Sequence, residues 1–397
     1  MTTLSVVIPA YNEENGIEEI ARRVLAVEPA LKEVGVNELE LIVVDDGSSD
    51  RTGEIAGSIE GVRLITQKNK GYGGALKTGF SNAKGELIGF LDADGTYPPE
   101  YFPQLCVAAL NGADLVIGSR RAGEKSEMPA TRRLGNFFFA NLLSLISRQR
   151  VSDSASGQRV FKREIYKRML PLPNGLNLTP VQSARALHEQ MKVVEVPIPY
   201  SERLGRSKLS VVHDGRVFLQ SILWTVMMYN PVRILGLIGL GGVIVAFLAF
   251  LALLIARLSG STSLGPWGIA GVFIGAISGV VGVSLYALGV TFNRLVGLFD
   301  REATSKQGMF GGLIFKESPD RYFGWAGILS LLLGVTIGIV SLMLGFSGWT
   351  IVQQWLYLLG SAMLILMGVQ LLISWIFVRA LDEISQRAEL TQQDLTG

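Results

Sequence analysis

Short apolar runs alternate with polar segments over the first 215 residues, and long uncharged runs replace them from about residue 230. The runs that predict buried strands are Leu4–Ile8, LELIVV ending at Asp45 and Asp46, VRLITQ, and ELIGFLDAD. Helical character is expected over residues 13–33 and after the loop that begins KNKGYGG. Continuous apolar strands that alternate with helices predict a parallel α/β sheet.

Polar residues follow three of these predicted strands directly. The segments are Pro9-Ala10-Tyr11, Asp45-Asp46 and Asp92-Ala93-Asp94. Parallel sheets bind ligands just beyond the carboxyl ends of their strands, so the three segments are expected at one edge. Two carboxylates spaced D-x-D fit a hard divalent cation such as Mg²⁺ or Mn²⁺, which commonly bridges to phosphate oxygens.

The second part of the chain predicts four membrane-spanning helices. The candidates are Ile234–Ile255, about Trp267–Phe292, about Phe323–Phe346 and about Ile351–Val378. Each is long enough to cross about 30 Å of hydrocarbon. Their glycines suit close helix packing in lipid, and the lack of an acidic residue deep inside them argues against a pump.

The loop charges predict the orientation of these helices. Between the second and third spans lie Arg294, Arg301, Lys306, Lys316 and Arg321, whereas the other two connections carry no charge. Basic loops stay on the cytoplasmic side, and the N-terminus lacks the features of a secretory signal. We therefore expect a multi-pass protein of the plasma or inner membrane with both termini and the catalytic domain in the cytoplasm.

The composition of the chain gives further indications about its class, its partners and its possible sites. Charged residues are 18% of the chain, against about 25% in soluble globular proteins. The formal net charge of +2 gives no reason to expect nucleic acid as a partner. The single cysteine, Cys106, cannot form an internal disulfide, and neither His188 nor His213 has the spacing of a metal or acid–base site.

The expected domains are therefore a catalytic domain over residues 1–212, a linker over 213–231, a membrane domain over 232–380 and a tail over 381–397. The linker region is predicted to be an amphipathic helix lying on the bilayer. The residues that share its apolar face are Val212, Val217, Phe218, Leu219, Ile222, Leu223 and Val226.

Seven segments of the first 215 residues together resemble family 2 glycosyltransferases with a GT-A fold, and more narrowly the polyprenyl-phosphate hexose synthases. They are VVIPAYNEE (6–14), IVVDDGSSDRT (42–52), NKGYGGALKTG (69–79), LDADGTYPPE (91–100), VIGSR (116–120), SDSASGQRVFKRE (152–164) and EVPIPYSERLGRSKLS (195–210). The resemblance implies an α/β, Rossmann-like GT-A domain, followed here by an all-α membrane domain of four helices.

The resemblance also implies a donor site for a nucleotide sugar. The residues that it assigns to the nucleoside are Pro9, Tyr11, Glu13, Asp45 and Asp46. The resemblance places Asp92, Ala93 and Asp94 beside the diphosphate of the nucleotide sugar. Of the two aspartates, Asp94 is the one expected to bind the metal directly. Many relatives carry a glutamine where this chain has Thr96, and a hydroxyl there can serve as the third ligand or hold a water.

The glycine-rich segment GYGGALKTG does not have P-loop spacing, because Leu76 stands where that motif needs glycine. We interpret Asn69, Lys70 and the glycines as an edge of the donor pocket. An ordinary helix N-terminus is the alternative.

The acceptor implied by the resemblance is a polyprenyl phosphate. The residues expected to bind its phosphate are Arg120, Arg132, Arg133, Arg203 and Ser207. Arg206 and Lys208 are expected to act with Asp94 in catalysis. Arginine forks match phosphate oxygens bidentately, although binding of anionic headgroups is an alternative for Arg132 and Arg133.

The predicted activity is metal-dependent, inverting transfer of a hexose from a UDP- or GDP-sugar to an undecaprenyl or dolichyl phosphate. One alternative is a processive polysaccharide synthase, but that class needs a Q-x-x-R-W motif and Ala186 stands where the tryptophan would be. The other alternative is a membrane adaptor with a decayed transferase domain. The sequence does not determine which sugar is transferred, which base the nucleotide carries or the oligomeric state, and it is compatible with a homo-oligomer.

Overall fold

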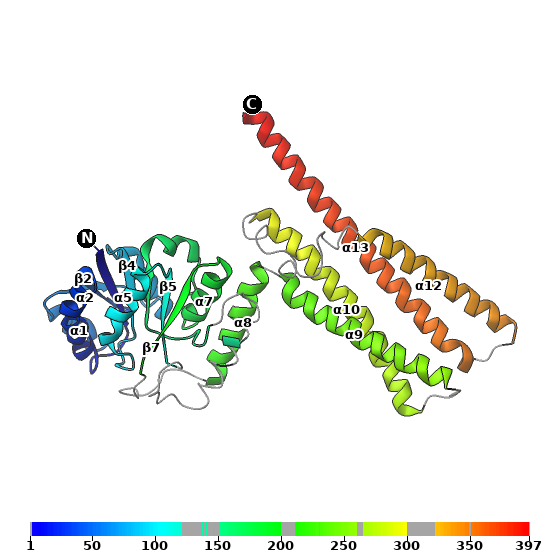
Figure 1. Ribbon diagram of the computed structural model, residues 1–397, viewed down its shortest axis with the longest axis horizontal. Helices are drawn as coiled ribbons and strands as arrows, with labels where there is room; N and C mark the ends of the chain where they lie inside the picture. Colours follow the sequence, from blue (N-terminus) through cyan, green and yellow to red (C-terminus); the bar gives the residue numbers. More distant parts are fainter. Residues whose placement is uncertain are drawn as a thin grey trace. The chain divides into compact units, whose positions relative to one another are not determined.

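The computed structural model describes residues 2–120, 137, 140–141, 144, 151–199, 211–229, 231–259, 265–299, 322–348 and 351–396. The chain divides into two compact units, Met1–Val226 and Met227–Gly397. The first unit is a sheet with helices packed on it, and the second consists of long helices (Figure 1).

The first unit alternates strands and helices along the chain. Its elements are β1 (Thr2–Ala10), α1 (Ile17–Ala26), α2 (Glu28–Glu33), β2 (Val36–Asp45), α3 (Thr52–Ser58), β3 (Val62–Thr66), α4 (Tyr72–Asn82), β4 (Leu87–Phe90), η1 (Pro99–Tyr101), α5 (Phe102–Leu110), β5 (Leu115–Ser119), β6 (Arg159–Lys162), η2 (Arg163–Met169), α7 (Leu178–His188), β7 (Val193–Pro197) and α8 (Val211–Tyr229). The helix expected over residues 13–33 is divided in two, because Pro29 at the start of α2 has no backbone N–H to continue the hydrogen bonds of α1.

The strands form one mixed sheet in the order β3-β2-β1-β4-β6-β5-β7. Strands β1 to β4 are parallel, as the sequence predicts, but β6 is antiparallel to both β4 and β5. The parallel pairing expected of the first four strands is therefore confirmed, and the antiparallel direction of β6 was not predicted. The reason is that β5 ends at the same edge at which β6 begins, so the chain has to run back through the sheet.

The two faces of the sheet are covered by different helices. Leu4, Val6 and Ile8 of β1 belong to a buried core with side chains of α1 and α5. Val7, between them, points to the other face, where a Cβ on Gly79 of α4 would lie 2.2 Å from its Cγ1. This close approach of α4 to β1 requires glycine.

A buried arginine, Arg159, holds the mixed part of the sheet together. Its Nε donates to Ser156 O at 3.0 Å and its Nη2 to Ser154 O at 2.7 Å. Its Nη1 donates to Ser183 Oγ and Gln182 Oε1 on α7, at 2.9 and 3.2 Å. Burial lowers the pKa of Arg159 to about 10, so it remains charged at neutral pH. This guanidinium therefore ties residues 154–156 to both β6 and α7.

The helix α8 packs on the rest of the first unit through Ser221, Ile222 and Thr225. Ile222 is fully buried, Thr225 is nearly so, and Ser221 Oγ accepts a hydrogen bond of 2.6 Å from Asn177 Nδ2. Trp224 of the same helix is 55% exposed. That α8 also lies on the bilayer stays a prediction.

In the described residues of the second unit, four helices are long and apolar enough to cross a membrane. They are α9 (Pro231–Leu258), α10 (Pro266–Phe299), α12 (Phe323–Phe346) and α13 (Ile351–Thr396). α9 packs on α10 and α12 on α13, and α10 also contacts α13 (Figure 1). A Cβ on Gly239 of α9 would lie 2.6 Å from Gly282 O of α10, which confirms that glycines allow the close packing.

Replacing Arg159 with methionine is expected to lower the free energy of unfolding of the first unit by about 3 kcal/mol, because several buried acceptors lose their donor. Pulse proteolysis of the full chain in detergent with increasing urea measures the change. The control is Arg168→Met, which removes a half-exposed partner of Glu189 and is expected to change stability by less than about 0.5 kcal/mol. Equal losses in the two variants would contradict a special role for Arg159.

Candidate active site

The ends of β1, β2 and β4 bring the predicted polar segments to one edge of the sheet. Ala10 pairs with Asp45 in the parallel register of β1 and β2, and Val7 pairs with Phe90 in that of β1 and β4. The chain after Phe90 keeps this direction, because Leu91 N donates to Val7 O at 3.3 Å. The expected convergence of three segments is therefore confirmed.

The acidic pair after β2 holds two neighbouring loops. Asp45 Oδ1 accepts from Ser48 N at 3.0 Å, which closes the turn before α3. Asp46 accepts from the backbone N–H groups of Lys70 and Gly71 at 2.9 and 2.8 Å, and from Gln67 Nε2. Both carboxylates are more than nine-tenths buried, so these donors replace the water that they lose.

The loop after β1 interlocks with the loop after β2. Asn12 adopts a left-handed backbone conformation with φ of 52°, and its Oδ1 accepts from Ser49 N at 2.8 Å. Glu13 N donates to Thr52 Oγ1 at 2.8 Å. Between buried Pro9 and this loop, Tyr11 is 41% exposed, so its ring is accessible at the edge of the sheet.

The glycines after Lys70 serve close packing rather than a phosphate cradle. A Cβ on Gly73 would lie 2.3 Å from Pro173 O, and Gly74 N already donates to Asn174 O at 3.1 Å. Gly71 has φ of 84° and gives its N–H to Asp46. Asn69 and Lys70 are exposed, and their place at an edge of a donor pocket stays a prediction.

The D-x-D carboxylates have different partners. Asp92 Oδ1 accepts from the hydroxyl of Tyr72 at 2.7 Å, and burial together with the charge of Asp92 raises the pKa of Tyr72 well above its usual value. Asp94 Oδ1 accepts from Thr96 N and Thr96 Oγ1 at 3.1 and 2.6 Å. Thr96 is nearly fully buried, and its hydroxyl orients Asp94.

This donor set fits a divalent cation bound together with a diphosphate. Within the described ranges, no group of three or more His, Cys, Asp and Glu side chains is arranged to hold a metal ion. Two carboxylates and a hydroxyl are nevertheless enough for Mg²⁺ or Mn²⁺, which usually keeps waters and takes the remaining ligands from substrate phosphates. Asp92, Asp94 and Thr96 as metal ligands stay a prediction.

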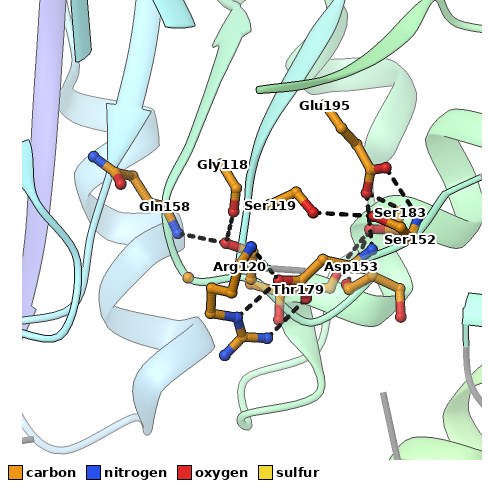
Figure 2. A network of polar contacts seen from close by, with 12 residues as sticks. Gly118, Ser119, Arg120, Ser152, Asp153, Gln158, Thr179, Ser183 and Glu195 are labelled. Atoms are coloured by element: carbon orange, nitrogen blue, oxygen red, sulfur yellow. Dashed lines mark hydrogen bonds and ion pairs between the residues drawn. The ribbon is translucent and has the colours of Figure 1, made fainter. Parts of the chain in front are cut away.

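Arg120 is held by a buried carboxylate that the sequence analysis did not single out. Its Nε and Nη2 donate to the two oxygens of Asp153 at 2.8 and 2.7 Å, and its backbone N–H bonds to the same group (Figure 2). Asp153 is fully buried and Arg120 is 11% exposed. Asp153 therefore fixes the orientation of the Arg120 guanidinium, and the contact of Arg120 with a phosphate stays a prediction.

Glu195 of β7 anchors the other side of the same segment. Its Oε1 accepts from Ser152 N and Asp153 N at 2.9 and 2.8 Å, and Ser119 Oγ lies 3.0 Å from Ser152 Oγ (Figure 2). Buried ionic groups of this kind are stable only when such hydrogen bonds surround them. The segment that begins at Ser152 is therefore fixed between β5 and β7.

Tyr97 connects this network to the D-x-D turn. Its ring lies under the guanidinium of Arg120, at 5.8 Å from the ring centroid, and its hydroxyl accepts from Gly157 N at 2.7 Å. A Cβ on Gly157 would lie 2.6 Å from Asp92 Oδ2. The network therefore runs from Arg120 through Tyr97 and Gly157 to Asp92.

Sequence reasoning missed Tyr72, Tyr97, Asp153 and Glu195. Each of them stands inside one of the seven quoted segments, but no spacing rule assigns them a partner. A separate group of expected residues lies outside the described part of the chain. These residues are Arg132, Arg133, Arg203, Arg206, Ser207 and Lys208.

Comparison with known proteins gives two family matches. Residues 5–170 match the model of Glycosyl transferase family 2, and residues 231–392 match one described as a domain of unknown function. A dolichyl-phosphate hexose transferase of Haloferax volcanii is 33% identical over 220 residues, which are 55% of this chain and 92% of that protein. An undecaprenyl-phosphate 4-deoxy-4-formamido-L-arabinose transferase of Edwardsiella ictaluri is 31% identical over 278 residues, covering 68% and 81% of the two chains.

Solved structures with a similar course of the chain include a glucosyl-3-phosphoglycerate synthase of Mycobacterium tuberculosis in complex with Mn²⁺, uridine diphosphate and glucosyl-3-phosphoglycerate. It is 23% identical, covers 56% of this chain and 80% of that chain, and has a TM-score of 0.46.

The family match includes β1 to β4 and the polar segments that follow β1, β2 and β4, so it coincides with the candidate site. The Haloferax volcanii relative is matched over nearly its whole length. The chain belongs to glycosyl transferase family 2.

Proposed function

We propose that this glycosyltransferase moves a hexose from a UDP- or GDP-linked sugar to a polyprenyl phosphate. The observation that carries the proposal is the edge at which Tyr11, Asp92 and Asp94 meet. The names of the Haloferax volcanii and Edwardsiella ictaluri relatives support the acceptor, because both combine a sugar with a polyprenyl phosphate.

The nucleoside is proposed to bind beside the end of β1. The exposed ring of Tyr11 can stack on the base. Asp45 and Asp46 support this site through the loops that they hold, since their oxygens accept from backbone N–H groups of those loops. Glu13 belongs to the same interlocked loops.

The diphosphate is proposed to bind beside Asp94, with Asp92 and Thr96 next to it. These residues would hold a divalent cation, which would supply positive charge to the leaving nucleoside diphosphate. Thr96 keeps the carboxylate of Asp94 in one orientation, and Tyr72 does so for Asp92. Asn69 and Lys70 lie at the rim, where the ammonium group of Lys70 can approach an anionic donor.

The acceptor is a phosphate monoester, which is already anionic at neutral pH and needs no strong general base. Direct displacement at the anomeric carbon then inverts its configuration without a covalent enzyme intermediate. Arg120 is proposed to orient the acceptor phosphate while Asp153 keeps its guanidinium in place. Further arginines of the expected acceptor loops lie outside the described residues.

The membrane helices are proposed to place this reaction at the cytoplasmic face. The apolar spans are shown by their length and hydropathy, and their orientation is inferred from the basic loop between the second and third. Polyprenyl phosphate is membrane-bound, so an anchored transferase reaches it at high local concentration.

One structural observation disfavours a processive polysaccharide synthase. The segment where that class carries its acceptor motif lies here in α7, and Gln182 and Arg185 are both more than nine-tenths buried. Their side chains therefore do not line an open acceptor channel.

Purified full-length protein is expected to convert a radiolabelled UDP- or GDP-sugar and undecaprenyl phosphate into a product extractable by organic solvent. The reaction should stop with EDTA and return with Mn²⁺ or Mg²⁺. Label that remains aqueous as polymer would show a polysaccharide synthase, and no transfer from any of the donors would contradict the proposal.

Replacing Asp94 with asparagine is expected to lower transfer by about 100- to 1000-fold, because the leaving group loses a charged metal ligand. The same assay at saturating Mn²⁺ measures the loss, and circular dichroism checks folding. Asp114→Asn is the control, since Asp114 pairs with Lys162 at the opposite edge of the sheet. Near-normal transfer by Asp94→Asn would remove the D-x-D turn from the mechanism.

Arg206→Ala is expected to impair transfer more than Arg387→Ala. Arg206 lies in the segment GRSKLS, which the family resemblance assigns to the lipid phosphate, whereas Arg387 follows the last membrane span. The rates of both variants with the same lipid acceptor test this expectation. Small and equal effects would place Arg206 outside the site.

A further inference from the structure

Tyr72 ties the beginning of α4 to the D-x-D turn. It is the first residue of α4, and its hydroxyl donates to Asp92 Oδ1 over 2.7 Å. Asp92 follows β4, so the hydrogen bond joins the start of α4 to the turn after β4. This contact determines how the carboxylate of Asp92 is oriented.

The other oxygen of Asp92 is confined as well. The Cα of Gly157 lies so close that a Cβ there would come within 2.6 Å of Asp92 Oδ2. Gly157 cannot move away easily, because its N–H donates to the buried hydroxyl of Tyr97. Asp92 is thus held between a hydrogen-bond donor on one side and a fixed backbone on the other.

The backbone around Tyr72 is itself held from two directions. Lys70 N and Gly71 N donate to Asp46, and Gly74 N donates to Asn174 O. A Cβ on Gly73 would meet Pro173 O at 2.3 Å, so this turn of α4 is packed directly against the neighbouring loop. Tyr72 therefore starts from a fixed backbone, and its hydrogen bond restricts Asp92 rather than the reverse.

We propose that Tyr72 is a positioning residue for cation binding: its hydroxyl holds Asp92, and through it the turn that presents Asp94 to the cation of the sugar nucleotide. The inference rests on the proposed function for the presence of that cation. Hydrogen bonds that orient carboxylates of a metal site typically change metal affinity by about 10- to 100-fold when they are removed. Tyr72→Phe keeps the ring and removes only this hydrogen bond.

The test is direct binding of Mn²⁺ to the full-length protein in detergent, measured in the presence of UDP and, separately, of GDP. Electron paramagnetic resonance of free Mn²⁺ gives the affinity without reference to activity. The matched control is Tyr166→Phe. Tyr166 belongs to η2 and packs edge-on against Phe80 of α4, at 5.6 Å between ring centroids, away from the D-x-D turn.

In Tyr72→Phe the dissociation constant of Mn²⁺ is expected to rise about tenfold, with the KM of the sugar nucleotide rising more than kcat falls. Excess Mn²⁺ should restore most of the transfer rate. Tyr166→Phe should bind Mn²⁺ as the wild type does. Wild-type Mn²⁺ affinity in Tyr72→Phe, whether or not its unfolding midpoint drops, would overturn the proposal.

Asp94→Asn separates the two ways in which the proposal could fail. If Asp94→Asn loses Mn²⁺ binding while Tyr72→Phe keeps it, the role of Tyr72 is wrong and the cation site stands. If Asp94→Asn also binds Mn²⁺ normally, the D-x-D turn is not the cation site, and the metal part of the proposed function fails together with this inference.

Discussion

Four carboxylates at one edge of a sheet are the constraint on which the site depends. Asp45 ends a buried strand and Asp46, Asp92 and Asp94 follow buried strands, where loss of water would be costly for a charged group. Backbone N–H groups compensate the first two, a tyrosine hydroxyl the third and a threonine the fourth. Each of these donors lies on a loop or helix start, so satisfying the charge also fixes the loop. The carboxylates therefore hold the loops of this edge in place, in addition to being the candidate binding groups of the site.

The segment from Ser152 to Arg159 links the two halves of the proposed reaction. At one end Asp153 binds Arg120, and at the other Gly157 lies against Asp92. The segment is rigid because Glu195 accepts its first N–H groups and Arg159 donates to its carbonyls. The proposed reaction between a soluble nucleotide sugar and a lipid phosphate needs both substrates held in one geometry, and a shared rigid segment suits this requirement.

Much of the fold follows from local pattern alone. The apolar runs locate β1 to β4, and long uncharged runs locate the four membrane helices, because burial in a sheet or in lipid demands such runs wherever they occur. The antiparallel direction of β6 could not be predicted from the sequence, because its four residues, RVFK, fit a parallel and an antiparallel strand equally well. Its orientation depends on where the preceding chain re-enters the sheet. The packing role of Gly71 and Gly73 was likewise not predictable, because their partners Pro173 and Asn174 come from a distant segment.

The sequence by itself determined the two-part organisation, the family, and the edge at which Tyr11, Asp92 and Asp94 converge, because strand ends and D-x-D spacing are local properties. Only the tertiary structure decided which partner each charge has. Arg120, expected to meet a phosphate, is bound by Asp153, and Asp92 is bound by Tyr72. The physical reason is that a carboxylate or guanidinium binds whichever complementary group the fold brings within about 3 Å. Such groups come from segments far apart in the chain, so the spacing of residues along the sequence does not predict which groups will pair.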